Sequence, residues 1–240
     1  VNFMAKYARG LICISITKND ANRLSLDLME QINTSLHETN FTVSVDAVAN
    51  TTTGISAQDR AQTIRLMVDE KSIPSDFARP GHIFPIIAKD GGVLRRSGHT
   101  EASMDLAQLA GFKPSGVLCE IMAEDGSMLR GKALSSFAKN HNLNLISISE
   151  LIAYIRINKN LVEKVEAVRF PTEYGEFLLH LYQDKFEDKQ HIALTYGKLS
   201  TNEPVLVRVH SECVTGDIFS SSRCDCGKQL KYAMKTIEKN

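Results

Sequence analysis

The sequence lacks an excess of charge of either sign, a long apolar run and a secretory signal. Its 28 lysines and arginines balance its 28 aspartates and glutamates, so no overall field favours nucleic acid or a membrane surface as a partner. Every apolar run is much shorter than the roughly 20 residues that a bilayer-spanning helix needs. The start of the chain shows no basic segment, apolar stretch and cleavage site in succession. We therefore expect a cytoplasmic protein.

The sequence also has few cysteines, and they are unevenly placed. An odd count of five, without a signal peptide, argues against a disulfide framework. Three of them, Cys213, Cys224 and Cys226, fall within fourteen residues. Three thiolates can hold Zn²⁺ and leave its fourth tetrahedral position to water, as in catalytic zinc sites. The spacing also allows a structural site completed by His210, or three thiols without metal.

The patterns of apolar residues in the sequence indicate a fold of mixed strands and helices, of the α+β class. Apolar or alternating runs predict strands at residues 9–17, 41–47, 116–122 and 143–148. Helical periodicity predicts helices at residues 20–32, 56–69, 100–110, 133–142 and 151–158. Ser147 and Glu150 have the spacing of a capping box before the last of these. Residues 71–94 contain three prolines and three glycines, which favours a loop with short extended pieces.

The sequence pattern changes after the helix predicted at residues 151–158. Residues 158–167 are polar and mostly aperiodic, which is typical of a linker. Extended runs at 174–184, 191–197 and 204–212 then predict an antiparallel sheet. We expect a mixed-sheet layered domain at 1–157 and the β-rich beginning of a second, α/β domain at 168–240. Both ends of the sequence fall within helical patterns, so we expect a piece of a longer protein.

A group of polar residues precedes the helix expected at 100–110. Arg96 offers a planar fork of donors suited to phosphate, and Gly98 lets backbone approach a ligand closely. Thr100 stands near the helix N-terminus, where free backbone N–H groups favour an anion. His99 is a candidate metal ligand or acid–base group. This set suits an enzyme acting on a small phosphorylated sugar, although an ordinary helix cap beside a surface histidine has the same sequence.

Two further residues are candidates for chemistry. His82 lies in a stiff Pro/Gly segment at 79–85, and such segments position functional groups. Glu120 lies among the apolar residues of a predicted strand, where a carboxylate should be paired, bound to metal or shifted in pKa. A solvated loop histidine and an outward-facing strand glutamate are the plainer alternatives.

Residues 5–154 resemble the 3,4-dihydroxy-2-butanone 4-phosphate synthase family. The likeness is carried by "TTTGISAQDRAQTIR", by "RPGHIFPIIAKDGGVLRRSGHTEASMDLAQLAGFKPSGVLCEIMAEDGSM" and by "FAKNHNLNLISISELIAY". It implies conversion of ribulose 5-phosphate into 3,4-dihydroxy-2-butanone 4-phosphate and formate with Mg²⁺ or Mn²⁺, and a homodimer. It implies that His82 and Glu120 are catalytic and that His99 binds the metal. The substrate would be bound by Arg96, Ser97, Gly98, His99, Thr100 and Glu120.

The sequence departs from this family in one respect. The family has an acidic loop upstream that supplies a glutamate metal ligand and an arginine, and no acidic cluster precedes residue 9 here. His99 would then be the sole ligand from that site, and Mg²⁺ prefers oxygen ligands, carboxylates above all. We expect little or no synthase activity from these 240 residues alone.

Residues 168–239 resemble the GTP cyclohydrolase II family. The likeness is carried by "FPTEYGEF" and "PVLVRVHSEC" with the later "RCDC". It implies a catalytic zinc held by Cys213, Cys224 and Cys226, and opening of the guanine imidazole ring with release of formate and pyrophosphate. It implies contacts to GTP from Arg208, Val209, His210, Ser211, Glu212 and Gln229.

The order of the two resemblances is that of the bifunctional proteins of riboflavin biosynthesis. The match to the second family is partial, so we expect no cyclohydrolase activity from these residues alone. Two other classes stay open. One is a remnant without catalysis that dimerises or binds partners, and the other is a binding module stabilised by a structural zinc.

Overall fold

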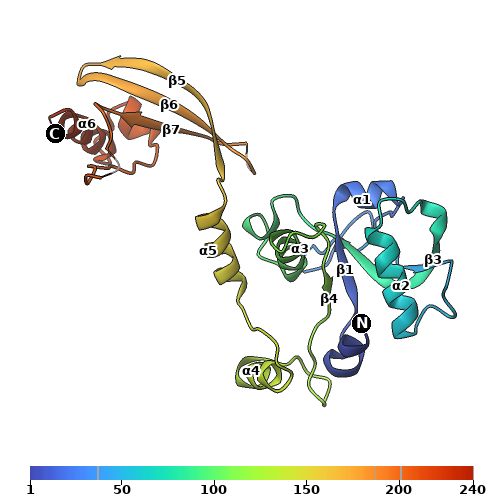
Figure 1. Cartoon of the computed structure of the whole chain (residues 1–240). Helices are drawn as coiled ribbons and strands as arrows, with labels where there is room; N and C mark the ends of the chain where they lie inside the picture. The colour runs from blue at the N-terminus through green and yellow to red at the C-terminus, as the bar shows by residue number, and fades with distance from the viewer. Residues whose placement is uncertain (37, 187, 201, 240) are drawn as a thin grey trace. The chain divides into compact units, whose positions relative to one another are not determined.

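The computed structural model describes residues 1–36, 38–186, 188–200 and 202–239. The chain divides into two compact units, Val1–Lys159 and Asn160–Asn240 (Figure 1). Each unit has its own sheet. Within the described ranges, no helix has both the length and the apolar character needed to cross a membrane.

The first unit is built on a mixed four-stranded sheet. Its strands are β1 (Cys13–Ile16), β2 (Val45–Ala47), β3 (Phe77–Ile87) and β4 (Val117–Leu118), in the order β2-β3-β1-β4. Strands β1 and β3 run parallel, whereas β2 pairs with β3 and β4 with β1 in antiparallel fashion. The predicted α+β class is confirmed.

The first unit also contains helices and single turns. The helices are α1 (Lys18–Arg23), α2 (Ala57–Val68), α3 (His99–Leu109), α4 (Gly131–Asn140) and α5 (Ile148–Asn158). Single turns are η1 (Met4–Ala8), η2 (Pro74–Asp76) and η3 (Gly92–Leu94). Helix α2 contacts β2 and β3, and α3 contacts β1 and β4. The predicted capping box at Ser147 and Glu150 is confirmed, with the Glu150 amide donating to the Ser147 hydroxyl at 3.2 Å.

The core of the first unit lies around β1, all four residues of which are buried. Because β1 has a strand on each side and helices above it, its β-branched residues lose nearly all contact with water. The main cluster consists of Ile12, Ile14, Ile16, Ala21, Leu24, Leu26, Val45, Met67, Phe77 and Ile83. A smaller cluster of Val93, Ala102, Leu151 and Ile155 joins α3 to α5.

Strand β3 corrects the loop predicted for residues 71–94. The register against β2 pairs Val45 with Ile83 but Asp46 with Ala78, so residues 79–82 bulge out of the ladder. Pro80 therefore stands where the ladder needs no amide donor, and a proline is tolerated there. The prolines and glycines that suggested a loop in fact make a long strand with a bulge in the middle.

The strand predicted at residues 143–148 is also wrong. Residues 141–147 form no regular structure, and α5 already begins at Ile148. Leu143, Leu145 and Ile146 are about half exposed. An alternating apolar pattern predicts a strand only where a neighbouring strand offers its hydrogen bonds, and the first unit offers none at this place among its described residues.

A buried threonine joins α2 to the end of β2. The hydroxyl of Thr63 accepts the amide of Ala47 at 2.9 Å and donates to the carbonyl of Asp59 at 3.1 Å. Thr63→Val keeps the shape of the side chain and leaves the buried Ala47 amide without its acceptor. We expect a loss of about 1–3 kcal/mol in the free energy of unfolding, measured in urea. Thr53→Val, at an exposed position, is the control, and equal losses for both variants would contradict this account.

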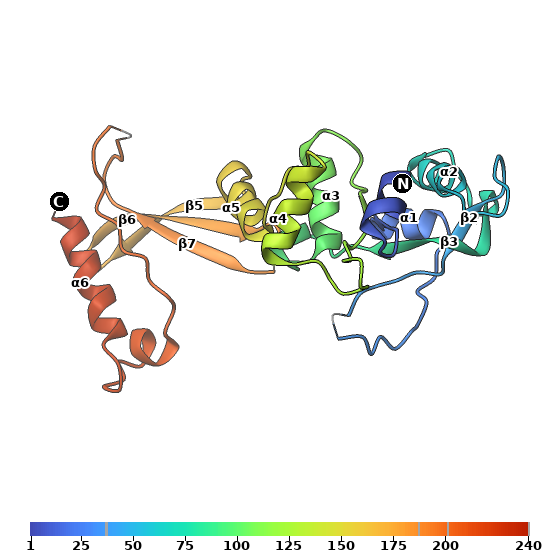
Figure 2. The same cartoon turned by 90° about the horizontal axis from the view of Figure 1, so that it is seen from below.

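The second unit contains a three-stranded antiparallel sheet and one helix. Strands β5 (Val162–Thr172), β6 (Gly175–Asp184) and β7 (Gln190–Thr195) lie side by side in that order as a long ribbon (Figure 2). The turn η4 (Val214–Ile218) and helix α6 (Cys226–Glu238) follow. Residues 162–167 of the expected linker thus lie in β5, and the extended run expected at 204–212 pairs with no strand among the described residues.

Candidate functional sites

The N-terminus of α3 carries the first candidate group. Helix α3 begins at His99 after the N-cap Gly98, which provides no side-chain cap. Arg96 lies against this end, and its guanidinium donates to Glu101 at 2.8 Å and to the hydroxyl of Thr39 at 3.2 Å. The free N–H groups and the guanidinium make this end of the helix attractive to an anion.

Glu101 was not among the predicted site residues, and it is fully buried. Its second oxygen accepts the backbone amide of Lys89 at 3.0 Å. One turn later, Asp105 accepts the amide of Val93 at 2.8 Å. These two carboxylates fasten the Gly-rich loop before η3 to α3. The buried face of α3 therefore carries two carboxylates. Leu106, which was predicted to lie on the buried face, is 42% exposed.

The other predicted residues at this helix end differ in exposure. Ser97 and His99 are exposed, and Thr100 is buried with 5% of its surface accessible. The carbonyl of Thr100 accepts the hydroxyl of Ser103 at 2.8 Å. Ser97 and His99 are therefore open to solvent, the side chain of Arg96 is 24% exposed, and Thr100 is buried.

His82 forms a second group on the bulge of β3. Its ring Nδ1 lies 2.6 Å from a carboxylate oxygen of Asp46 on β2. The side chain of His82 is 42% exposed and that of Asp46 only 13%. The sequence analysis did not single out Asp46, although a carboxylate in an otherwise apolar predicted strand was a signal that could have pointed to it. The ring is thus held on one side and open to solvent on the other.

Glu120 forms a third group, just after β4. Its carboxylate accepts the amide of Leu11 at 2.9 Å. Burial, and then the negative charge of Glu120, raise the pKa of Cys13 to about 12. The pKa of Cys119 is raised as well, by burial first and also by the charge of Glu120, against smaller lowering effects of the Gly10 backbone and of Arg60 on α2. Glu120 is exposed, so its carboxylate can reach a ligand from the end of the sheet.

The three cysteines of the second unit come together in space. Their sulfur atoms all lie within 4.8 Å of one another, and those of Cys213 and Cys224 are 3.8 Å apart. Zn–S bonds of about 2.3 Å at tetrahedral angles place sulfurs about 3.8 Å apart, so these residues fit a zinc ion. Gly216 packs on the cluster, and a Cβ there would lie 2.7 Å from the sulfur of Cys224.

Hydrogen bonds already prepare this cluster for a cation. The amide of Gly216, followed by the hydroxyl of Thr215, lowers the pKa of Cys213. The hydrogen bond that it shares with Cys213 raises the pKa of Cys226 to about 11. These hydrogen bonds thus favour the thiolate form at Cys213 and the thiol form at Cys226. Bound metal replaces such shared protons, because thiolates are its ligands.

The predicted GTP-contact residues lie beside this cluster. Arg208 donates to the side-chain oxygen of Gln229 at 2.5 Å, across 21 residues of sequence. His210 is bound to Asp217 at 3.0 Å, and Asp217 also accepts the amide of Cys213 at 2.8 Å. These two hydrogen bonds, that from His210 first, lower the pKa of Asp217. His210 is therefore tied to Asp217 and not grouped with the three thiols.

A pocket of about 280 Å³ opens next to Arg208. Its walls come from the extended segment before Arg208 and from one face of α6. They are formed by Leu206, Val207, Arg208, Gln229, Tyr232, Ala233, Thr236 and Ile237. Val209, Ser211 and Glu212, the remaining predicted GTP contacts, lie outside these walls, and Val209 is 87% exposed.

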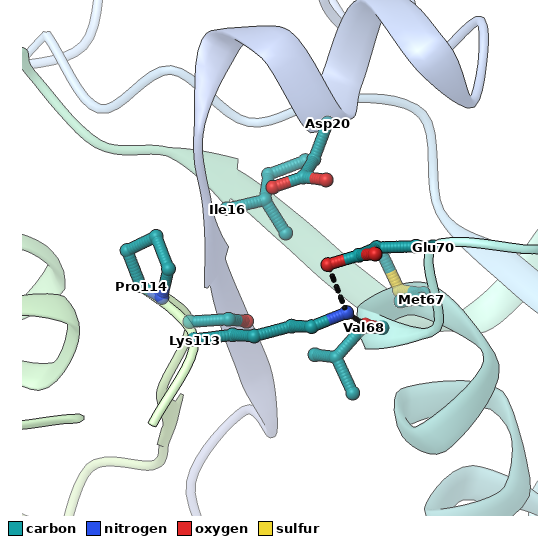
Figure 3. Close-up of a pocket in the computed structure, with 8 residues that line it drawn as sticks. Ile16, Asp20, Met67, Val68, Glu70, Lys113 and Pro114 are labelled. Atoms are coloured by element: carbon teal, nitrogen blue, oxygen red, sulfur yellow. Dashed lines mark hydrogen bonds and ion pairs between the residues drawn. The ribbon is translucent and has the colours of Figure 1, made fainter. Parts of the chain in front are cut away.

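A smaller hollow of about 140 Å³ in the first unit contains none of the predicted site residues. Lys113 contacts Glu70 at 3.0 Å, as Figure 3 marks, and donates to the carbonyl of Val68 at 2.8 Å. The hydroxyl of Thr17 donates to the carboxylate of Asp20 at 2.7 Å. We therefore interpret the hollow as a structural junction between α2 and the loop after α3.

The two predicted metal sites differ in how far the described residues complete them. Across those residues, the three cysteines are the only group of three or more side chains placed to share a metal ion. His99 stands outside any such group. The residues present therefore fit a zinc ion in the second unit, and they do not complete a magnesium site around His99.

Comparison with known proteins gives the family. The 3,4-dihydroxy-2-butanone 4-phosphate synthase family matches residues 1–154, and the GTP cyclohydrolase II family matches residues 163–240. A riboflavin biosynthesis protein RibBA of Aquifex aeolicus is 54% identical over 241 residues, covering 100% of this chain and 59% of that protein. One of Bacillus cereus is 54% identical over 239 residues, covering 100% of this chain and 60% of that protein. The chain thus spans about 60% of the length of these curated relatives.

Solved structures agree with this assignment. RibBX, a two-domain 3,4-dihydroxy-2-butanone 4-phosphate synthase from A. baumannii, is 40% identical with a TM-score of 0.77. That match covers 95% of this chain and 67% of the other. A 3,4-dihydroxy-2-butanone 4-phosphate synthase in complex with two magnesium ions is 40% identical with a TM-score of 0.62, over 65% of this chain and 78% of the other. The chain belongs to the 3,4-dihydroxy-2-butanone 4-phosphate synthase family and continues, after that domain, into a GTP cyclohydrolase II segment.

Proposed function

We propose that the first unit binds D-ribulose 5-phosphate and serves its conversion into 3,4-dihydroxy-2-butanone 4-phosphate and formate. The observation that carries this proposal is Arg96, held by the buried Glu101 at the uncapped N-terminus of α3. A guanidinium beside free helix N–H groups suits the dianionic phosphate of a small sugar. The family match over residues 1–154 supplies the substrate class.

The roles follow from the chemistry of the side chains. Arg96 and the backbone of Gly98 to Thr100 would hold the phosphate and so orient the carbon chain. His82 and Glu120 would move protons at the carbons next to the ketone, which are the acidic C–H positions of a ketose. The five-carbon substrate gives a four-carbon and a one-carbon product without an added oxidant or water, so acid–base groups are the main requirement.

A divalent metal is part of this proposal at the level of the family. A related synthase structure contains two magnesium ions, and His99 is the candidate ligand in this chain. The described residues leave a magnesium site around His99 incomplete. We therefore expect these 240 residues to bind the substrate and to exchange its protons faster than they complete the conversion.

The test follows the substrate by NMR in D₂O with Mg²⁺ present. We expect deuterium to enter ribulose 5-phosphate next to the ketone, with formate appearing slowly or not at all. His82→Ala and Glu120→Ala should each lower the exchange rate by about 100-fold or more. Absence of both exchange and formate at millimolar substrate would overturn the proposal. Rapid formate release would instead overturn the inference that the metal site is incomplete.

For the second unit we propose a Zn²⁺ ion on Cys213, Cys224 and Cys226, beside a GTP-contact region. A zinc ion there would supply an acidified water at its fourth position. The contact between Arg208 and Gln229 supports the GTP region, because it joins two of the predicted contact residues. The buried Nδ1 of His210, which has no hydrogen-bond partner among the described residues, supports it too. Incubation with GTP and Zn²⁺ should release no formate from these residues alone, and release would correct that expectation.

A purely binding module is the alternative to catalysis. It predicts saturable binding of ribulose 5-phosphate without deuterium exchange, and zinc bound without an exchangeable water. The homodimer implied by the family is a separate prediction, to be measured by light scattering of the chain. Each of these results is independent of the others.

A further inference from the structure

Strand β1 carries one hydroxyl, that of Ser15, and it lies in the core of the first unit. Ser15 stands between Ile14 and Ile16 and is fully buried. A buried hydroxyl without hydrogen-bond partners would destabilise the fold. The partners of Ser15 therefore indicate what this residue does.

The hydroxyl of Ser15 uses its whole capacity for hydrogen bonds. It accepts the backbone amide of Gly116 at 2.9 Å and donates to the carbonyl of the same residue at 3.2 Å. It also accepts the hydroxyl of Ser103 at 2.9 Å. A serine hydroxyl has one proton and two lone pairs, so these three contacts leave none of them free. Ser15 thus links α3, which carries Ser103, to the residue just before β4.

The contact with Ser103 fixes where α3 lies on the sheet. Among the described residues, it is the one hydrogen bond that joins α3 to a strand. Apolar packing between α3 and β1 has no preferred direction, so it places a helix less narrowly than a hydrogen bond does. The helix and the segment before β4 also approach closely here, since a Cβ on Gly116 would lie 2.5 Å from the carbonyl oxygen of Ser103.

Each side of this link leads to a group of the proposed site. The hydroxyl of Ser103 also donates to the carbonyl of Thr100, in the first turn of α3, where Arg96 lies. On the other side, Gly116 leads into β4, and Glu120 follows that strand and accepts the amide of Leu11. The phosphate-binding end of α3 and the carboxylate of Glu120 therefore come from two elements that Ser15 joins.

We propose that Ser15 and Ser103 are positioning residues that set the placement of the phosphate-binding end of α3 relative to Glu120. The proposal rests on the proposed function for the identity of the substrate and for the roles of Arg96 and Glu120. The phosphate and the carbons next to the ketone are joined by a short carbon chain, so the anchor and the proton-transferring group must match its length. A misplacement of about 1 Å can slow such a reaction by about 100-fold.

Ser103→Ala removes the link and leaves both contacts between Ser15 and Gly116 in place. At saturating ribulose 5-phosphate with Mg²⁺ in D₂O, we expect deuterium exchange to slow by about 10-fold or more, because Glu120 no longer matches the bound carbon chain. The dissociation constant of ribulose 5-phosphate, measured by calorimetry, should change by less than about twofold, because Arg96 keeps its contact with Glu101 of α3. A residue that only stabilised the fold would not separate these two quantities.

The matched control is Ser135→Ala on α4. Ser135 is also a helix serine whose hydroxyl donates to a carbonyl of its own helix, that of Gly131 at 3.4 Å, and it bonds to no strand among the described residues. This variant should change neither exchange nor binding. Ser15→Ala, which also deprives the Gly116 amide of its acceptor, should slow exchange at least as much as Ser103→Ala.

Three results would contradict the proposal, and they differ in what else they contradict. Exchange as fast in Ser103→Ala as in Ser135→Ala would overturn the positioning roles and leave the proposed function intact. Weaker binding by Ser103→Ala at an unchanged rate of saturated exchange would do the same, because the link would then serve the anchor alone. An unaltered chain that neither binds ribulose 5-phosphate nor exchanges its protons would overturn the proposed function and the positioning roles together.

Discussion

The chain should bind one Zn²⁺ tightly, and Cys226→Ser should lower its zinc affinity by about 100-fold or more. The three sulfurs already lie within 4.8 Å of one another without metal. Zinc binding therefore needs little rearrangement of η4 and the start of α6. A serine hydroxyl is a much poorer zinc ligand than a thiolate, and two thiolates hold zinc far more weakly than three.

The measurement is metal content after dialysis, followed by competition with a chromophoric chelator. The matched control is Cys119→Ser, a thiol of the first unit outside the cluster, which should keep full affinity. Zinc retained equally by Cys226→Ser, or no zinc in the unaltered chain, would contradict the assignment. His210→Ala adds a discriminating arm, because a strong loss there would favour a structural four-ligand site.

The second large effect is expected at Glu101. Its carboxylate is fully buried, pairs with Arg96 at 2.8 Å and accepts the Lys89 amide at 3.0 Å. Glu101→Ala leaves the guanidinium and the amide without their acceptor and opens a cavity. Breaking such a buried pair costs about 3 kcal/mol or more in the free energy of unfolding. Glu101→Gln keeps the volume and one acceptor, so it should lose less.

Urea unfolding, followed by methyl NMR signals of Leu24 and Leu26 in the core, measures these losses. The control is Glu124→Ala, which removes an exposed pair with Arg9 at 3.7 Å and should leave stability nearly unchanged. A loss for Glu101→Ala no greater than that of the control would refute the role given to the buried pair.

Several helices were predictable, although the helix predicted at residues 20–32 is wrong beyond Arg23, where α1 ends. The predicted region at residues 56–69 became α2 with Ser56 as its cap, and the capping box placed the start of α5. Both signals are local, since they depend on neighbours a few residues away. Predictions from local signals hold in the folded chain because they do not depend on contacts with residues distant in sequence.

The strands were less predictable, since their partners lie far away in sequence. Pro80 and Gly81, in the bulge at residues 79–82, made the sequence of β3 look like a loop. The strand becomes evident only from its pairing with β2. Strand β5 looks polar, because much of it is exposed on both faces of a thin sheet. Residues 143–147 show the opposite error, an apolar pattern without a partner strand.

The sequence nominated candidate site residues but not the residues that hold them in place. Resemblance named Arg96, His82 and Glu120, whereas their partners Glu101 and Asp46 were missed. Both partners act over contacts that periodicity does not show, and Glu101 occupies a buried helix face where an apolar residue is expected. Carboxylates within a buried helix face or strand are therefore a signal that a nearby arginine or histidine is held by them.

The central claim is that the first unit recognises a sugar phosphate through Arg96. Calorimetric titration of ribulose 5-phosphate into the 240-residue chain, with Arg96→Met and the neighbouring Arg95→Met beside it, tests this claim most directly. We expect saturable binding, weakened about 10- to 100-fold by Arg96→Met, little changed by Arg95→Met, and absent for ribulose without its phosphate. Equal affinity of the two variants, or equal binding of ribulose and its phosphate, would contradict the account.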